Sequence, residues 1–84
     1  MPFGIKSTEC NVKIQAQISS QQSVVVYSWW VNYQGAPVLY ADVQPGKSYV
    51  QKTYGSHPWI VADEQGNTLQ LFIGETANMD ITIK

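Results

Sequence analysis

The sequence contains no arginine: all five basic residues are lysines, and the formal net charge is −1. Arginine carries the planar fork of donors that recognises phosphates and guanine edges, and no run of lysines stands in for it. A basic patch is the usual electrostatic mark of a nucleic-acid-binding protein. We therefore expect no nucleic-acid partner.

Cysteine and histidine each occur once, as Cys10 and His57. A lone cysteine excludes an internal disulfide and a cysteine-rich zinc site, and it fits a reducing compartment. A single histidine among scattered carboxylates has no metal-ligand spacing, so we expect neither a metal nor another cofactor. The amino terminus lacks the apolar run of a signal peptide, and no apolar run is long enough to span a membrane. These absences predict a cytoplasmic protein with no membrane partner.

A catalytic arrangement is also missing. His57 follows Ser56 directly, and the side chains of neighbours in an extended segment point apart. Nothing resembles a nucleophile elbow, and neither Ser56 nor Cys10 is accompanied by a recognisable set of catalytic groups. We predict that the protein is not an enzyme.

What the sequence does contain is a period of two residues, which is typical of β-strands. Apolar residues at 12, 14, 16 and 18 alternate with polar ones. Further β-rich segments, separated by turn signals, cover residues 24–33, 38–43, 48–54, 59–62, 68–73 and 79–84. Pro45-Gly46 suits the centre of a type II turn. The pattern predicts one all-β domain over residues 1–84, a small antiparallel β-sandwich of about seven strands without a long helix.

Strand alternation separates the two adjacent tryptophans. It places Trp29 with Val31 on one face, among apolar neighbours, and Trp30 with Ser28 on the other. We therefore expect Trp29 to belong to the core, and Trp30 to lie on the face nearer water.

The same rule applied to the next strand predicts that Leu39, Ala41 and Val43 point inward and that Tyr40 points outward. Trp30 and Tyr40 would then meet on a polar face. Exposed aromatic residues that gather together usually mark a binding surface.

The stretch Tyr54-Gly55-Ser56-His57-Pro58-Trp59 allows two interpretations. It is a strand-joining loop whose rings cover the end of the core, or it borders a pocket with Trp30 and Tyr40. The second interpretation gives rigid rings that suit a flat or pyrrolidine-like ligand, with the imidazole as hydrogen-bonding group.

The residues from Trp30 to Trp59 resemble the β-domain of the von Hippel–Lindau tumour suppressor. The resemblance rests on the ordered spacing Trp30-Val31-Asn32-Tyr33-x-Gly35-x-Pro37, Tyr40, Pro45-Gly46 and Thr53-Tyr54-x-x-His57-x-Trp59. It implies a prealbumin-like β-sandwich. It also implies capture of a peptide that carries 4-hydroxyproline, as that family does with a hypoxia-inducible transcription factor.

Carried over to this sequence, the resemblance implies a hydroxyproline pocket. Trp30 would form its floor, Tyr40 a wall that offers its phenol to the ligand backbone, and His57 the contact to the 4-hydroxyl. Trp59 would form a second wall and Tyr54 the rim. Thr53 stands where the family usually has a serine that shares the hydroxyl contact.

The sequence also departs from the family pattern. Gly55-Ser56 replaces an arginine–glycine pair, and Pro58 stiffens the loop. The family's helical domain, which docks a ubiquitin-ligase adaptor, has no counterpart before Lys84, so we expect no such docking through this chain. Three functions stay open: a proline- or hydroxyproline-peptide-binding module, a carbohydrate-binding β-sandwich that uses the same rings, and a structural or inhibitory β-domain without a small-ligand pocket.

Overall fold

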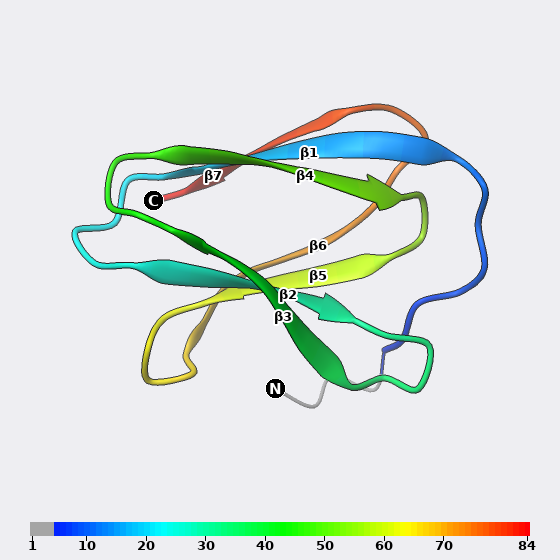
Figure 1. Cartoon of the computed structure of the whole chain (residues 1–84), viewed down its shortest axis with the longest axis horizontal. Helices are drawn as coiled ribbons and strands as arrows, with labels where there is room; N and C mark the ends of the chain where they lie inside the picture. Colours follow the sequence, from blue (N-terminus) through cyan, green and yellow to red (C-terminus); the bar gives the residue numbers. More distant parts are fainter. Residues whose placement is uncertain (1–4) are drawn as a thin grey trace.

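Two β-sheets packed face to face make up the computed structural model, which describes residues 5–84 (Figure 1). The strands are β1 (Lys13–Ser20), β2 (Val26–Val31), β3 (Pro37–Val43), β4 (Ser48–Tyr54), β5 (Pro58–Ala62), β6 (Thr68–Ile73) and β7 (Met79–Ile83). One sheet has the order β4-β1-β7 and the other β3-β2-β5-β6. In the described part of the chain, β1 and β7 pair in parallel and all other pairs are antiparallel. The predicted all-β sandwich of seven strands is confirmed. Among the residues described, no helix is long and apolar enough to cross a bilayer.

The main core lies between the two sheets. Each strand contributes its inward positions, as the alternation of buried and exposed residues along β1 illustrates. Trp59 is the largest of the fully buried side chains. The other members of this cluster are Ala16, Ile18, Val26, Val43, Val61, Phe72 and Ile83. Removing this apolar surface from water is the main force that holds the sheets together.

A second, smaller apolar cluster lies on the opposite face of the four-stranded sheet. Val31, Ile60 and Ala62 form it, and Ile5 and Trp29 pack against them. The segment before β1 passes over one end of the sandwich (Figure 1). All five residues of β5 are therefore buried, which explains why its sequence is apolar without alternation.

The assignment of the two tryptophans to opposite faces is confirmed, but the choice of the inner face is wrong. Trp30 packs against the main core, whereas Trp29 lies over the smaller outer cluster, and both are half-buried. The physical reason is that both faces of this sheet are covered. Ser28 lies on the same face of β2 as Trp30. Its polarity suggested that this face is exposed to water, but Ser28 is fully buried.

The predicted facing of β3 holds at Ala41 and Val43 but is wrong at Leu39 and Tyr40, because the strand contains an irregularity. Ser28 pairs with Ala41 and Trp29 with Leu39, so Tyr40 is skipped in the register. An extra residue of this kind breaks the alternation of side chains and re-aims one of them. Tyr40 turns to the inner-face rings, and Leu39 is 52% exposed, while Val43 is buried as expected.

The Pro45-Gly46 turn between β3 and β4 forms as the sequence predicts. Gly46 has a φ of 71°, and the amide of Lys47 donates to the carbonyl of Gln44 over 3.0 Å. A positive φ at the third turn residue is what a type II turn requires, and glycine meets it without steric cost.

Gly74, just after β6, lies against the backbone at the end of β4. A Cβ atom there would come within 2.3 Å of the Tyr54 carbonyl oxygen and 3.2 Å of the Ile14 side chain. We therefore expect Gly74→Ala to lower the free energy of unfolding by about 1–3 kcal/mol, because backbone must move to admit the methyl group. Urea unfolding measures this loss of stability. A Gly74→Ala variant as stable as the wild type would contradict the close approach of Gly74 to the Tyr54 carbonyl.

Candidate functional site

Six aromatic rings gather at one end of the sandwich, and we call this group the aromatic cage. Its members are Trp30, Tyr33, Tyr40, Tyr54, His57 and Trp59. Trp30 is central, with ring centroids 5.5 Å from Tyr33, 6.1 Å from Tyr40 and 5.6 Å from His57. Most pairs meet edge to face, the arrangement that ring quadrupoles favour.

Trp59 anchors the cage to the core. Its side chain is 2% exposed, and its ring centroid lies 5.1 Å from that of Tyr40. The indole Nε1–H donates to the Thr53 hydroxyl oxygen over 2.9 Å. This buried bond ties β5 to the opposite sheet, because Thr53 lies on the inward face of β4. The hydroxyl keeps its own proton, so Thr53 remains a donor.

The turn between β2 and β3 positions Tyr33. The Asn32 carboxamide oxygen accepts from the backbone amides of Gln34 and Ala36, over 3.0 and 2.9 Å. A side chain that bonds its own downstream backbone fixes a tight turn. Tyr33 therefore points back over the end of β2, and its hydroxyl lies 3.4 Å from His57 Nε2.

His57 lies in the β4–β5 loop, held between three neighbouring rings. Its side chain is 5% exposed, and its ring centroid is 5.6 Å from Tyr33 and 5.5 Å from Tyr54. Burial lowers the pKa of His57 from its ordinary value of 6.5, although a hydrogen bond to the Thr8 backbone acts against this. The imidazole is therefore neutral at pH 7 and offers one donor and one acceptor.

The segment before β1 fixes the His57 loop in place. Ser56 adopts a φ of 63°, which an L-residue rarely takes. Its hydroxyl donates to the Thr8 carbonyl over 3.2 Å and accepts from the Thr8 hydroxyl over 2.8 Å. The Ser56 amide also donates to the Gly74 carbonyl over 2.8 Å. These bonds hold the loop, and with it His57, against the cage.

The lowered pKa of His57 makes the fold sensitive to acid. Between its lowered pKa and 6.5, the unfolded chain binds a proton that the folded chain does not. Stability is therefore complete above pH 6.5 and is lost as the pH falls below that value. We expect the urea midpoint to drop over this range, and His57→Gln to remove the drop. The pKa of Asp63 is also lowered, but it affects stability only below its ordinary value of 3.8. The variant Asp63→Asn should therefore still show the drop in urea midpoint below pH 6.5.

The cage has an open side and an unused donor. Tyr33, Tyr40 and Tyr54 are 46%, 52% and 38% exposed, so three of the six rings face solvent. The Trp30 Nε1–H is buried and has no hydrogen-bond partner among residues 5–84. A buried donor left unpaired costs free energy, so its presence here fits a group that a ligand engages. Exposed rings that gather beside a polar group are typical of surfaces that bind a ligand.

All six residues that the sequence predicted for the site lie within this region. They are Trp30, Tyr40, Thr53, Tyr54, His57 and Trp59. Tyr33 was not among the predicted residues, although it lies inside the quoted motif. It lies two residues beyond the end of β2 at Val31, in a turn to which strand alternation does not extend.

Within residues 5–84, no group of three histidine, cysteine or acidic side chains is placed to hold a metal ion. The donors near the cage are a neutral imidazole, phenols, an indole and a hydroxyl. This donor set suits hydrogen bonding to an organic ligand.

This chain matches a known protein family over most of its length. The family described as the VHL beta domain matches residues 5–77, which include every strand from β1 to β6 and all the rings of the cage. A search of curated proteins found no match. The family is one of non-enzymatic, protein-binding domains, which supports a protein partner and a role without catalysis.

Proposed function

The chain belongs to the VHL beta domain family, and from this premise we propose that it is an interaction module for an extended peptide. The peptide inserts a proline or 4-hydroxyproline ring into the aromatic cage. The module acts in the cytoplasm as a single unit over residues 1–84. The observation that carries the proposal is the gathering of six rings, three of them beside Trp30, with a buried neutral histidine among them.

The proposed binding mode assigns the aromatic rings to the pyrrolidine ring. Trp30 forms the floor, and Tyr40 supplies an exposed wall whose hydroxyl reaches the peptide backbone. Trp59 closes the inner end, and Tyr54 forms the rim. Pyrrolidine is compact, apolar and rigid, so it loses little conformational entropy when it packs among rings.

The polar groups of the site are proposed to hydrogen-bond a hydroxyl substituent on the ligand ring. His57 offers its neutral imidazole, and Thr53 offers the hydroxyl proton that its bond with Trp59 leaves free. A 4-hydroxyl group donates once and accepts, so it is able to satisfy both. This pairing favours a peptide ligand over a sugar, because a sugar needs several directed polar groups around its rings.

A side-by-side binding screen tests the proposal. Matched hydroxyproline and proline peptides and a panel of simple glycans are titrated into the protein, with tryptophan fluorescence as the readout. We expect at least one peptide to bind, and Trp30→Ala to weaken it at least tenfold, since buried aromatic contacts contribute about 1–3 kcal/mol. Tyr27→Ala, on the opposite face, is the matched control. Glycan binding without peptide binding would overturn the proposal in favour of a carbohydrate-binding function. Absence of both would favour a structural domain.

A further inference from the structure

A surface hollow of about 610 Å³ adjoins the aromatic cage on the three-stranded sheet, and we call it the lysine hollow. It is lined by Lys13, Ile14, Gln15, Lys52, Thr53, Tyr54 and Asn78. Ile14 and Thr53 are buried, so the exposed side chains around the hollow are those on the outer face of β1 and β4, together with Asn78.

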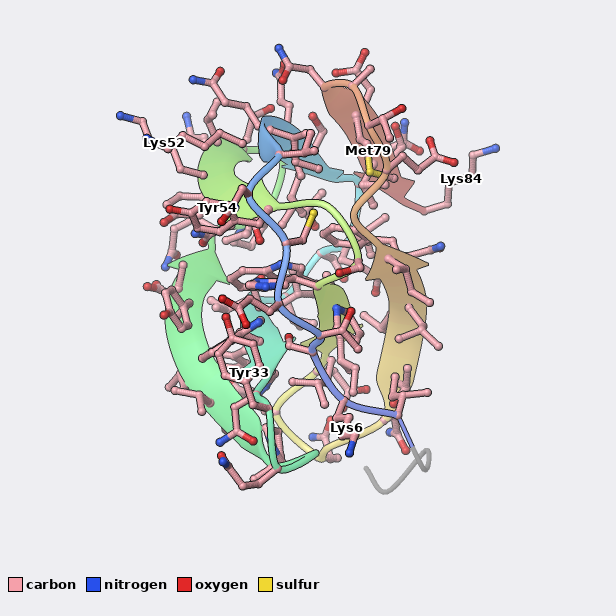
Figure 2. All side chains as sticks on the ribbon, turned by 90° about the vertical axis from the view of Figure 1, so that its right-hand side faces the viewer. Lys6, Tyr33, Lys52, Tyr54, Met79 and Lys84 are labelled. Atoms are coloured by element: carbon pink, nitrogen blue, oxygen red, sulfur yellow. The ribbon has the colours of Figure 1, made fainter. Side chains whose placement is uncertain are left out.

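Tyr54 belongs to both the hollow and the cage. It lines the hollow, and its ring centroid lies 5.5 Å from that of His57. Figure 2 shows Lys52 and Tyr54 on the same side of the molecule as Tyr33 of the cage. A ligand that leaves the cage past Tyr54 therefore meets the hollow next.

The hollow carries positive charge without a neutralising partner in its wall. Lys13 pairs with Tyr54 and Lys52 with Gln15 in the register of β1 and β4, so the two lysines are diagonal neighbours. Diagonal positions of this kind hold Cβ atoms about 7–8 Å apart, close enough for like charges to repel. No aspartate or glutamate is among the described residues that line the hollow. The repulsion is relieved when a negative group enters.

We propose that the lysine hollow selects peptides that carry an acidic residue close to the proline. This inference rests on the proposed function and names the kind of peptide that the cage takes. Lys52 and Tyr54 are two positions apart on β4, about 7 Å at the rise of a strand. An extended ligand therefore brings the carboxylate within reach when it lies about two or three residues from the proline.

The expected gain is modest, because exposed ion pairs contribute little and salt screens them. An acidic peptide should bind about three- to tenfold more tightly than its amide counterpart at low salt. The advantage should shrink between about 50 and 500 mM salt, while the contribution of the cage persists.

The test compares four peptides with the same central hydroxyproline by calorimetric titration. The first peptide has glutamine at the second and third positions on both sides of the hydroxyproline. The other three carry glutamate in place of these glutamines on the amino-terminal side, on the carboxyl-terminal side, or on both sides. We expect at least one glutamate peptide to show the gain. Lys13→Gln and Lys52→Gln should each reduce it, and the double variant should abolish it. Lys47→Gln is the matched control, since it removes the same charge in the turn at the far end of β4.

A charge-reversed variant sharpens the test. The double variant Lys13→Glu/Lys52→Glu should reverse the preference, so that a peptide with lysine in the flank binds more tightly than one with glutamate. Equal affinity of all four peptides for the wild type, or equal loss in Lys47→Gln and Lys52→Gln, would overturn the inference and leave the proposed function standing. Failure of every peptide to bind would instead overturn the proposed function itself.

Discussion

Replacing Trp59 with alanine should lower the free energy of unfolding by about 3–5 kcal/mol, the largest effect on stability that we expect from a single substitution. Trp59 is 2% exposed and is the largest fully buried side chain of the main core. Its loss leaves a cavity between the sheets and also orphans the Thr53 hydroxyl that accepts its indole proton. Urea or thermal unfolding, followed by circular dichroism, measures the change.

Two variants serve as controls for this prediction. Trp59→Phe keeps most of the ring volume and loses the hydrogen bond, so it should cost less than the alanine variant. Trp29→Ala should also cost less, because Trp29 is only half-buried against the smaller outer cluster. A larger loss for Trp29→Ala than for Trp59→Ala would mean that the energetic core lies on the outer face.

The largest effect on binding should be the preference for a hydroxylated ligand. A 4-hydroxyproline peptide accepts the Thr53 hydroxyl proton and gives His57 a further partner, whereas plain proline leaves that proton desolvated without an acceptor. An unpaired buried polar group costs about 1–3 kcal/mol, which corresponds to a preference of roughly ten- to several-hundred-fold. Calorimetric titration of the matched peptides measures the ratio.

Substitutions at Thr53 test which group reads the hydroxyl. Thr53→Ser keeps the hydroxyl and should keep the preference, whereas Thr53→Val should erase much of it. Thr53→Val also removes the acceptor for the Trp59 indole, so it should unfold more easily, and its binding is measured well below its unfolding midpoint. A wild-type protein that prefers plain proline would mean that the Thr53 methyl group crowds the hydroxyl.

The strands were predictable because their signal is local. A period of two residues and the turn signals between segments depend only on neighbouring residues, so they give the seven strands. The facing of Trp29 and Trp30 was not predictable in the same way. It depends on Ile5 and the segment before β1, which cover the second face of the four-stranded sheet and make both faces apolar.

The meeting of Trp30 and Tyr40 was predictable from alternation, but the face on which they meet was not. Both lie on the inner face, which Tyr40 reaches because β3 skips one residue in its register. Tyr33 reaches the cage from a turn, where alternation no longer applies. The lysine hollow depends on pairing between β1 and β4, which are far apart in the sequence, so no local pattern indicates it.

The indole N–H signals of the three tryptophans in a ¹H–¹⁵N NMR spectrum test the central claim most directly. Trp30 and Trp59 belong to the aromatic cage, whereas Trp29 lies on the opposite face of the same sheet. On titration with a hydroxyproline peptide, the signals of Trp30 and Trp59 should shift together, and that of Trp29, assigned from a Trp29→Phe variant, should stay in place. A shift confined to Trp29, or no shift in any indole at millimolar peptide, would contradict binding in the cage.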